Sequence, residues 1–140
     1  MHLLSLDPGN TTGWAVFNAE RHELLQAGAD KLTLYQLYKM IASTIPDEIV
    51  YESFRLYASK SDTMINNDFY PSQLIGVIKL YAEQFQVPII TQSAAKGKAI
   101  WKDDKLIKFG YSHNIIHARD AIRHGLTYLE THRTLEGWLK

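Results

Sequence analysis

The feature that most constrains the fold is the opening segment, which reads MHLLSLDPGNTTGWAVFN and places a turn between two apolar stretches. Residues 2–7 are short and apolar, as is typical of a mostly buried strand, and residues 13–18 fit a hairpin partner. Pro8 and Gly9 favour a tight reversal between them. The segment therefore predicts a β-hairpin. On its own it also fits a phosphate-gripping loop or the first corner of a metal site, because Asp7 stands at the start of the turn.

The rest of the chain alternates between strand-like and helix-like segments. We expect further strands over residues 22–28, 47–52 and 88–91. Apolar residues at helical spacing predict helices, the first capped by Thr33, and these cover residues 33–45, 71–85, 103–109 and 115–131. Three hairpin-type strands followed by alternating helices and strands indicate an α/β fold with a mixed sheet covered by helices.

The composition excludes several classes of protein. A chain of 140 residues with 46% hydrophobic and 21% charged residues can bury a core and is not expected to be disordered, so we expect one domain over residues 1–140. The absence of cysteine excludes disulfides and thiolate metal sites. No apolar run approaches the ~20 residues of a membrane span, and no signal-peptide pattern is visible. A cytoplasmic protein is the simplest expectation.

Charge is unevenly distributed along the chain. Residues 1–52 hold three basic and seven acidic side chains, a net charge of −4, whereas residues 53–140 carry a net charge of +4. The densest basic segment is KGKAIWKDDKLIK, which contains Lys96, Lys98 and Lys102. This asymmetry is compatible with a local basic face for an anionic partner, and equally with an ordinary solvated surface.

Two carboxylates stand at the ends of predicted strands. Asp7 ends the first strand and Glu52 ends the fourth, and strand ends in an α/β sheet commonly carry functional sites. In the last helix, His117 and Asp120 are one turn apart and share a side with His124, away from the apolar stripe. Three carboxylates and an imidazole that converge would bind a hard divalent cation. Two such ions can support phosphodiester hydrolysis.

Taken singly, each of these residues also has a purely structural explanation. Asp7 fits a cap of the turn, and Glu52 fits an ion pair with Arg55. His117 fits a surface position in the first turn of a helix. The occurrence of all three elements in this order favours a site.

Three segments resemble the active-site segments of the RuvC-like Holliday junction resolvases of the RNase H-like superfamily, and they read LSLDPGNTTGWAVF, IVYES and HARDAIRHGL. The resemblance covers nearly the whole chain and is greatest to the short variants of bacteriophages and Gram-positive bacteria. It implies an RNase H-like mixed five-stranded sheet flanked by helices. It also implies that Asp7, Glu52 and Asp120 are metal-binding catalytic acids, and that His117 occupies the family position that is either Asp or His.

The resemblance implies a divalent-metal-dependent, structure-selective endonuclease that hydrolyses phosphodiesters in branched DNA. Holliday junctions are the leading substrate, with forks or flaps as further ones. Two Mg²⁺ or Mn²⁺ ions per active site and no nucleotide cofactor are expected. A homodimer is also implied, because paired sites can cut symmetric strands, and we expect the helix over residues 74–85 to form part of its interface.

DNA contacts are expected in two regions. Residues 53–70 form the loop where the family contacts DNA, although this loop shares little with classical RuvC. Its aromatic and basic side chains could stack on unpaired bases and contact phosphates, and packing in the core or a dimer interface is the alternative for the aromatics. The family also has a basic segment after its central helix and next strand. The predicted DNA-binding residues are Arg55, Tyr57, Lys60, Phe69, Tyr70, Lys96, Lys98 and Lys102.

Three other functions match parts of the pattern. DPGNTTG also resembles the phosphate-binding turn of actin-like ATPases and sugar kinases, but those proteins need two domains, and no second phosphate turn is visible. An RNA-directed nuclease of the same fold, similar to YqgF or RNase H, would use the same metal chemistry. A non-catalytic branched-DNA-binding module would have no need of the full acidic set.

Overall fold

The chain begins with a meander of three strands. β1 (His2–Asp7), β2 (Thr12–Asn18) and β3 (Glu23–Asp30) pair in sequence order, each antiparallel to the next. In β1, Leu4 and Leu6 are fully buried, as expected of a central strand. The predicted hairpin is confirmed, and its third strand extends two residues further than the pattern indicated.

Two parallel strands complete the sheet. The computed structural model describes residues 1–53 and 69–133, and across these residues five strands form one sheet in the order β3-β2-β1-β4-β5. β4 (Glu48–Glu52) lies parallel to β1, and β5 (Ile89–Gln92) lies parallel to β4. The predicted mixed five-stranded sheet is therefore confirmed.

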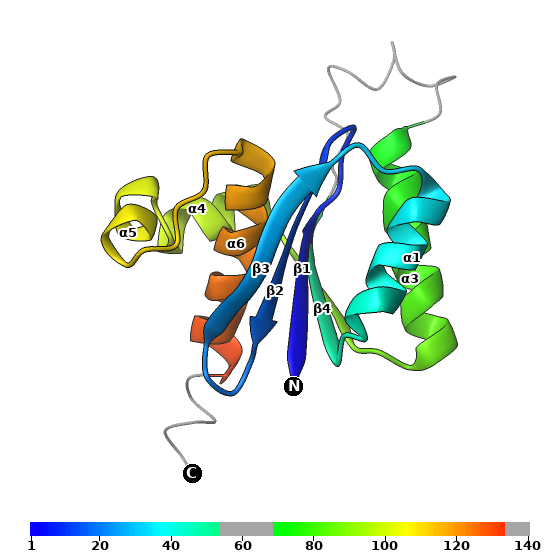
Figure 1. Cartoon of the computed structure of the whole chain (residues 1–140), viewed down its shortest axis with the longest axis horizontal. Coiled ribbons are helices and arrows are strands. Elements are labelled where there is room, and N and C mark those ends of the chain that lie inside the picture. The colour runs from blue at the N-terminus through cyan, green and yellow to red at the C-terminus, as the bar shows by residue number, and fades with distance from the viewer. Residues whose placement is uncertain (54–68, 134–140) are drawn as a thin grey trace.

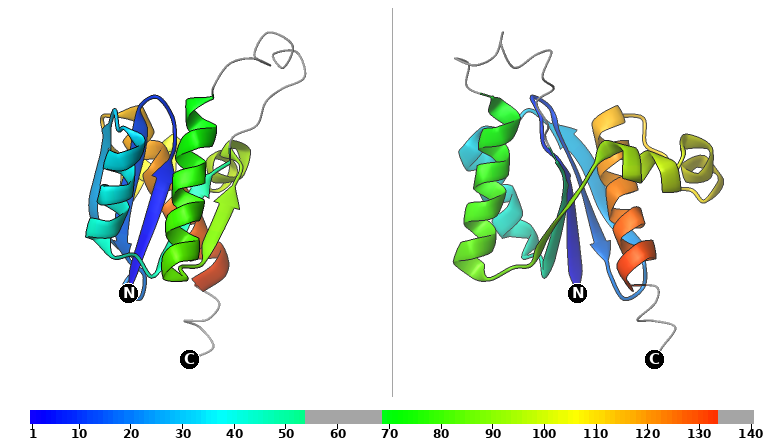
Figure 2. Two further views of the ribbon diagram at one scale, coloured as in Figure 1. Left: turned by 90° about the vertical axis from the view of Figure 1, so that its right-hand side faces the viewer. Right: turned by 180° about the vertical axis from the view of Figure 1, so that it is seen from behind.

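Helices cover both faces of this sheet (Figure 1, Figure 2). α1 (Leu34–Thr44) and α3 (Tyr70–Phe85) lie side by side on one face, and α6 (Ile116–Tyr128) packs on the other. α4 (Ala94–Ile100) and α5 (Asp103–Lys108) lie beyond α6, on the side away from the sheet. None of the helices in the described part of the chain has the length and apolar character of a membrane span.

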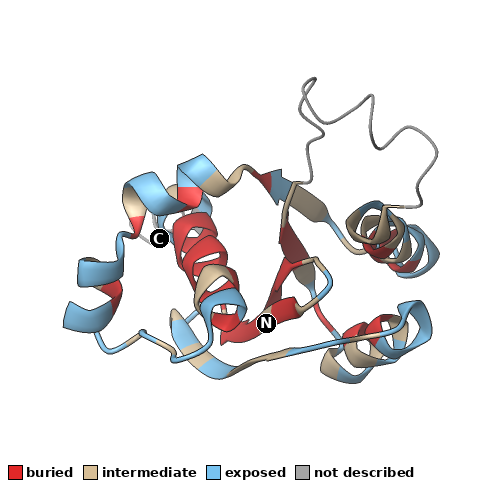
Figure 3. Cartoon of the chain, turned by 90° about the horizontal axis from the view of Figure 1, so that it is seen from above, coloured by how far each residue is buried: buried red, intermediate tan, exposed pale blue. Residues whose placement is uncertain are grey.

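The alternation of side chains along β1 divides the core between the two faces. Leu4 and Leu6 pack toward α1 and α3, whereas Ser5 points toward α6 and donates a hydrogen bond of 2.6 Å to the Ala121 carbonyl oxygen. Figure 3 shows buried residues along most of α6. Because the period of a strand is two residues, Asp7 lies on the same face as Ser5 and therefore faces α6.

Within residues 1–53 and 69–133, one α-helix was not predicted by the sequence pattern. The lysine-rich segment after β5 forms α4, which is capped by the Ser93 hydroxyl as it accepts the Lys96 backbone N–H at 3.2 Å. The helix has only seven residues and contains Gly97, so it carries little helical periodicity. The last predicted helix ends earlier than expected and continues as a π-helical turn over Leu129–Arg133.

Thr33 closes the start of α1 with a capping box. Its hydroxyl accepts the Gln36 backbone N–H at 3.1 Å, and the Gln36 side chain accepts the Thr33 backbone N–H at 2.9 Å. We expect Thr33→Ala to lower the free energy of unfolding by about 1 kcal/mol, as measured by urea denaturation. Ser43→Ala is the control on the same helix, because its hydroxyl only bonds the Met40 carbonyl within the helix. An equal loss in both variants would contradict the cap.

Candidate active site

Three parallel strands end at one edge of the sheet, facing α6. β1, β4 and β5 run in the same direction, so their carboxyl ends lie together. Leu6 and Tyr51, the residues before the strand ends, pack toward α1 and α3. The next residues, Asp7 and Glu52, therefore take the α6 face. Gln92, the last residue of β5, is the register partner of Glu52 and also faces α6.

α6 supplies the opposite wall of the site. His117 Nδ1 lies 3.1 Å from Asp7 Oδ2, and His124 Nε2 lies 3.2 Å from Glu52 Oε2. Asp120 lies between the two histidines on the helix, near enough for its charge to act on Asp7. The structure thus brings together the four side chains that the sequence singled out for a metal site, which are Asp7, Glu52, His117 and Asp120.

Burial acts against ionisation of both strand-end carboxyls, but their neighbours shift the two pKa values in opposite directions. Burial, with a hydrogen bond to Glu52 and the charges of Glu52 and Asp120, raises the pKa of Asp7 from 3.8 to about 9. Burial also raises the pKa of Glu52, but hydrogen bonds with His124 and Asp7 and the charges of His124 and Lys98 outweigh it, so this pKa is lowered. The opposite directions of the two shifts favour the proton of the pair on Asp7 and the negative charge on Glu52.

The donor chemistry of this edge fits a hard divalent cation. Carboxylate oxygens supplemented by one imidazole are ligands that Mg²⁺ and Mn²⁺ accept. In residues 1–53 and 69–133, no group of three His, Asp or Glu side chains is arranged as the ligands of one ion. The carboxyl groups instead bond to each other and to the histidines, and the raised pKa of Asp7 favours its protonated form. A cation in place of this proton would balance the negative charges of the carboxylates.

Gly13 allows α6 to approach the sheet at this point. It is the register partner of Asp7, and a Cβ at this position would lie 1.9 Å from the His117 carbonyl oxygen. Only glycine fits so close to another backbone segment. A hairpin residue therefore determines how near the first turn of α6, and with it the His117 imidazole, comes to Asp7.

Comparison with solved structures identifies the fold. The chain matches Thermus thermophilus RuvC in complex with a Holliday junction substrate at a TM-score of 0.73 and 16% identity, over 96% of both chains. The fowlpox virus Holliday junction resolvase matches at a TM-score of 0.63 and 16% identity, over 94% of this chain and 99% of that chain. The fold is that of RuvC. No protein-family profile and no curated protein sequence matches the chain. The fold implied by the sequence resemblance is thus confirmed.

Five of the predicted DNA-binding residues belong to the loop before α3 or to the first residue of that helix. Three of them lie outside the described residues, and these are Arg55, Tyr57 and Lys60. The Tyr70 hydroxyl donates to the Leu32 carbonyl oxygen, and its ring packs against the core between the sheet and α1 and α3. For Tyr70, these contacts agree with the alternative that the aromatic side chain packs in the core. Phe69 occupies the N-cap position of α3, and its side chain makes no capping hydrogen bond.

The three predicted lysines lie on α4 or just after it. Lys98 is near enough to the strand ends that its charge opposes the raised pKa of Asp7 and helps to lower that of Glu52. Lys98 and Lys102 line a cavity of about 310 Å³, and Lys96 is exposed on the same helix. The helix that the sequence pattern did not predict therefore places positive charge next to the acids.

Arg123 connects this basic cavity to the acidic edge. Its side chain is buried and lines the cavity together with Asp103. One guanidinium nitrogen, Nη1, donates to Asp120 Oδ1 at 3.1 Å, and Nη2 donates to Asp103 Oδ1. Arg123 thereby holds the Asp120 carboxylate against α5. Arg123 was not predicted as a site residue, because only its position three residues after Asp120 hints at a pairing.

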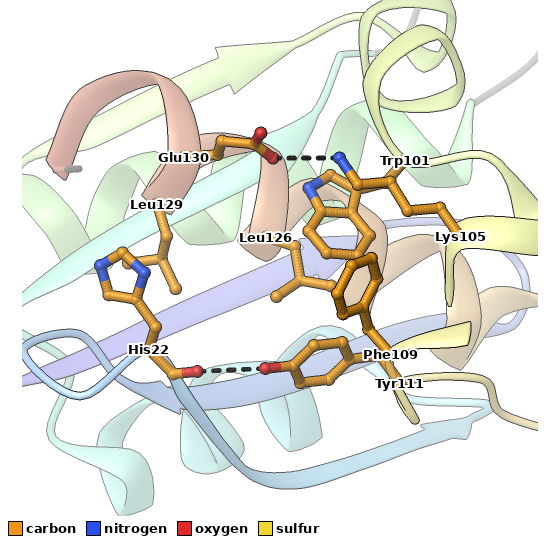
Figure 4. A pocket seen from close by; sticks show the side chains of 8 residues that line it. All are labelled: His22, Trp101, Lys105, Phe109, Tyr111, Leu126, Leu129 and Glu130. Atoms are coloured by element: carbon orange, nitrogen blue, oxygen red, sulfur yellow. Dashed lines mark hydrogen bonds and ion pairs between the residues drawn. The ribbon is translucent and has the colours of Figure 1, made fainter. Parts of the chain in front are cut away.

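A second cavity, of about 330 Å³, lies away from the acids (Figure 4). Trp101 and Tyr111 are among its aromatic lining residues, and Lys105 pairs with Glu130 across it at 3.6 Å. The Tyr111 hydroxyl donates to the His22 carbonyl oxygen at 3.4 Å. None of the predicted acids lines it. Its contacts join the segment around α5 to the C-terminal end of α6 and to the β2–β3 turn.

Proposed function

We propose that this chain is a divalent-metal-dependent endonuclease that hydrolyses phosphodiesters in branched DNA, with four-way junctions as the leading substrate. The observation that carries the proposal is the convergence of Asp7 and Glu52 with His117 and Asp120 at one edge of a RuvC-type sheet. The structures of Thermus thermophilus RuvC and the fowlpox virus resolvase were both determined with Holliday junction DNA. Buried carboxylates that oppose one another cost stability, and proteins retain such costs at functional sites.

In this proposal, the residues of the site have different roles in the reaction. Asp7, Glu52 and Asp120 would hold Mg²⁺ or Mn²⁺, with two ions per site in our proposal. Bound ions of this kind activate a water and neutralise charge on the leaving oxygen. His117 is 47% exposed while its Nδ1 contacts Asp7, so its ring can ligate at the rim or orient the attacking water. Lys98 and Lys102 would bind phosphates of the DNA backbone beside the acids.

The proposal includes a homodimer, because two symmetric strands of a junction require two sites. Leu80 and Phe85 on α3 are 59% and 53% exposed, which supports α3 as part of the interface. Sedimentation velocity tests this part, and a monomer at the concentrations used for cleavage would contradict it.

End-labelled DNA substrates test the proposed reaction. A four-way junction, a flap, an RNA–DNA hybrid and a linear duplex are each incubated with Mg²⁺, Mn²⁺ or EDTA. We expect the parent protein to cut the junction with either metal and not in EDTA. If the junction binds but stays uncut with both metals, the nuclease proposal fails. If the hybrid is cut and the junction is not, an RNA-directed nuclease of the same fold replaces it.

Metal binding should stabilise the fold more strongly as the pH rises. The pKa of Asp7 is about 9 in the folded chain against 3.8 for an ordinary Asp, so the metal-free fold loses stability as the pH rises through this interval. A cation that displaces the proton recovers this loss. We expect Mg²⁺ to raise the melting temperature more at about pH 8.5 than at about pH 6. Asp7→Asn is the control, in which the increment should lose this pH dependence, and an equal increment for the parent at both pH values would contradict the prediction.

A further inference from the structure

We infer that His124 and Gln92 are positioning residues that hold the Glu52 carboxylate in place for metal binding. The inference rests on the proposed function and deepens it. Neither residue belongs to the acidic set, and neither is expected to touch the DNA or the ion. Their role would be to fix the direction of a carboxylate that does.

The side chains of Glu52, His124 and Gln92 form a continuous hydrogen-bonded series. His124 Nε2 lies 3.2 Å from Glu52 Oε2, and His124 Nδ1 lies 2.9 Å from Gln92 Oε1. His124 and Gln92 are each 2% exposed, so water cannot readily take the place of either partner. The ends of β4 and β5 are further joined by the Ser53 backbone N–H, which donates to the Gln92 carbonyl oxygen at 2.9 Å. The series therefore ties α6 to two strand ends.

The direction of the hydrogen bond to Glu52 follows from the chemistry of the partners. An ionised carboxylate only accepts hydrogen bonds, so His124 Nε2 carries the proton in this contact. A neutral imidazole that donates from Nε2 accepts at Nδ1, so the Gln92 amide presents its nitrogen to Nδ1, and the positions of the amide oxygen and nitrogen are interchangeable by a flip of the amide. A buried N–H directed at one carboxylate oxygen restricts rotation of the Glu52 carboxylate. Such support of a ligand by its neighbours is a general requirement of accurate metal sites.

α4 packs against the His124 imidazole. Gly97 is buried, and a Cβ at this position would lie 3.3 Å from both Cε1 and Nδ1 of His124. The missing side chain lets α4 lie against the ring. The positive charge of the following residue, Lys98, acts to lower the pKa values of Asp7 and Glu52. The helix that carries the basic residues thus also confines the ring that holds Glu52.

Binding of Mn²⁺ to the protein, followed by electron paramagnetic resonance, tests the inference alongside junction cleavage. We expect His124→Leu to weaken Mn²⁺ binding by about 10-fold or more and to raise the Mn²⁺ concentration needed for half-maximal cleavage to the same extent. Junction binding in EDTA should stay at the parent level. His124→Gln can place an amide N–H near the position of Nε2, so it should recover much of the lost affinity. Thermal unfolding shows whether each variant is folded.

Gly97→Ala provides a second test that does not depend on the stability of a His124 variant. Alanine favours helix over glycine by about 1 kcal/mol, so this change need not destabilise α4. Its Cβ would press on the His124 ring, and we expect Mn²⁺ binding to weaken several-fold. Gly76→Ala on α3 is the matched control for Mn²⁺ binding and stability, because a Cβ there meets no atom of residues 1–53 or 69–133 within 4 Å.

The possible results separate this inference from the proposed function. The inference is overturned if folded His124→Leu and Gly97→Ala both bind Mn²⁺ as the parent does. If His124→Leu does not fold, Gly97→Ala decides alone. A parent that binds Mn²⁺ but cuts no DNA would refute the nuclease proposal, while the positioning role would still be decided by metal binding. A parent that binds no Mn²⁺ would overturn both.

Discussion

Asp7→Asn is expected to abolish DNA cleavage while making the metal-free fold more stable. Asp7 is 9% exposed, and its carboxyl contacts His117 and hydrogen-bonds with Glu52. Asparagine has nearly the same shape but no ionisable group, so it removes both a cation ligand and a buried group whose ionisation the fold opposes. We expect cleavage of a four-way junction to fall by about 10³-fold or more. We expect the free energy of unfolding in EDTA at about pH 8 to rise by about 1–3 kcal/mol.

The sign of the stability change follows from the raised pKa of Asp7. The folded chain retains the Asp7 proton up to about pH 9, whereas an unfolded Asp releases it near 3.8. The metal-free parent therefore loses stability as the pH rises between these values, and the Asn variant does not. Urea denaturation in EDTA at about pH 5 and about pH 8.5 should show a gain that is larger at the higher pH.

Asp47→Asn is the matched control for this experiment. Asp47 lies at the opposite end of the sheet, where its carboxylate accepts the His2 backbone N–H at 2.8 Å. The same substitution there should not increase stability and should leave cleavage at the parent level. An Asp7→Asn variant that is less stable than the parent at high pH without metal would refute the electrostatic account of the site.

Gly13→Ala should disable the site without changing any acid. A Cβ at position 13 would lie 1.9 Å from the carbonyl oxygen and 2.3 Å from the carbonyl carbon of His117. These are backbone atoms, so no side-chain rotation relieves the overlap and the first turn of α6 must move. We expect a loss of about 2–4 kcal/mol in the free energy of unfolding. Cleavage should fall by about 10²-fold or more, because His117 and Asp120 move with the helix.

Gly9→Ala is the control for Gly13→Ala. Gly9 belongs to the same turn, but among the described residues a Cβ there would contact only the Thr11 carbonyl oxygen, at 3.2 Å. Its effect on stability should therefore be smaller than that of Gly13→Ala. Denaturation and junction cleavage of both variants measure the difference. A Gly13→Ala variant with parent stability and parent cleavage would show that α6 does not need this close approach.

The strand ends that carry Asp7 and Glu52 could be predicted because their signals are local. Apolar strand segments and a Pro-Gly turn depend on neighbouring residues, and so do the caps and periodicity of α1 and α3. α4 could not be predicted in this way. It is short, it contains Gly97, and its buried glycine packs against His124, a residue 27 positions further along the chain.

His124 and Gln92, which support Glu52, also differ in how far local sequence signals could predict them. His124 shares a helical side with His117 and Asp120, so the sequence placed it near the site without assigning it a partner. Gln92 had no comparable signal, because a lone glutamine at a strand end is uninformative. Their partnership with Glu52 depends on where α6 crosses the ends of β4 and β5.

The sequence by itself determined the order of the five strands and of the helices other than α4, the positions of the acids at strand ends and the spacing of His117 and Asp120. Only the tertiary structure decided that α6 lies close enough for His117 to reach Asp7, that His124 and Gln92 hold Glu52, and that α4 brings Lys98 to the acids. The physical reason is that turn propensity and periodicity act over a few residues. Electrostatics and close packing act between residues that folding brings together from distant parts of the chain.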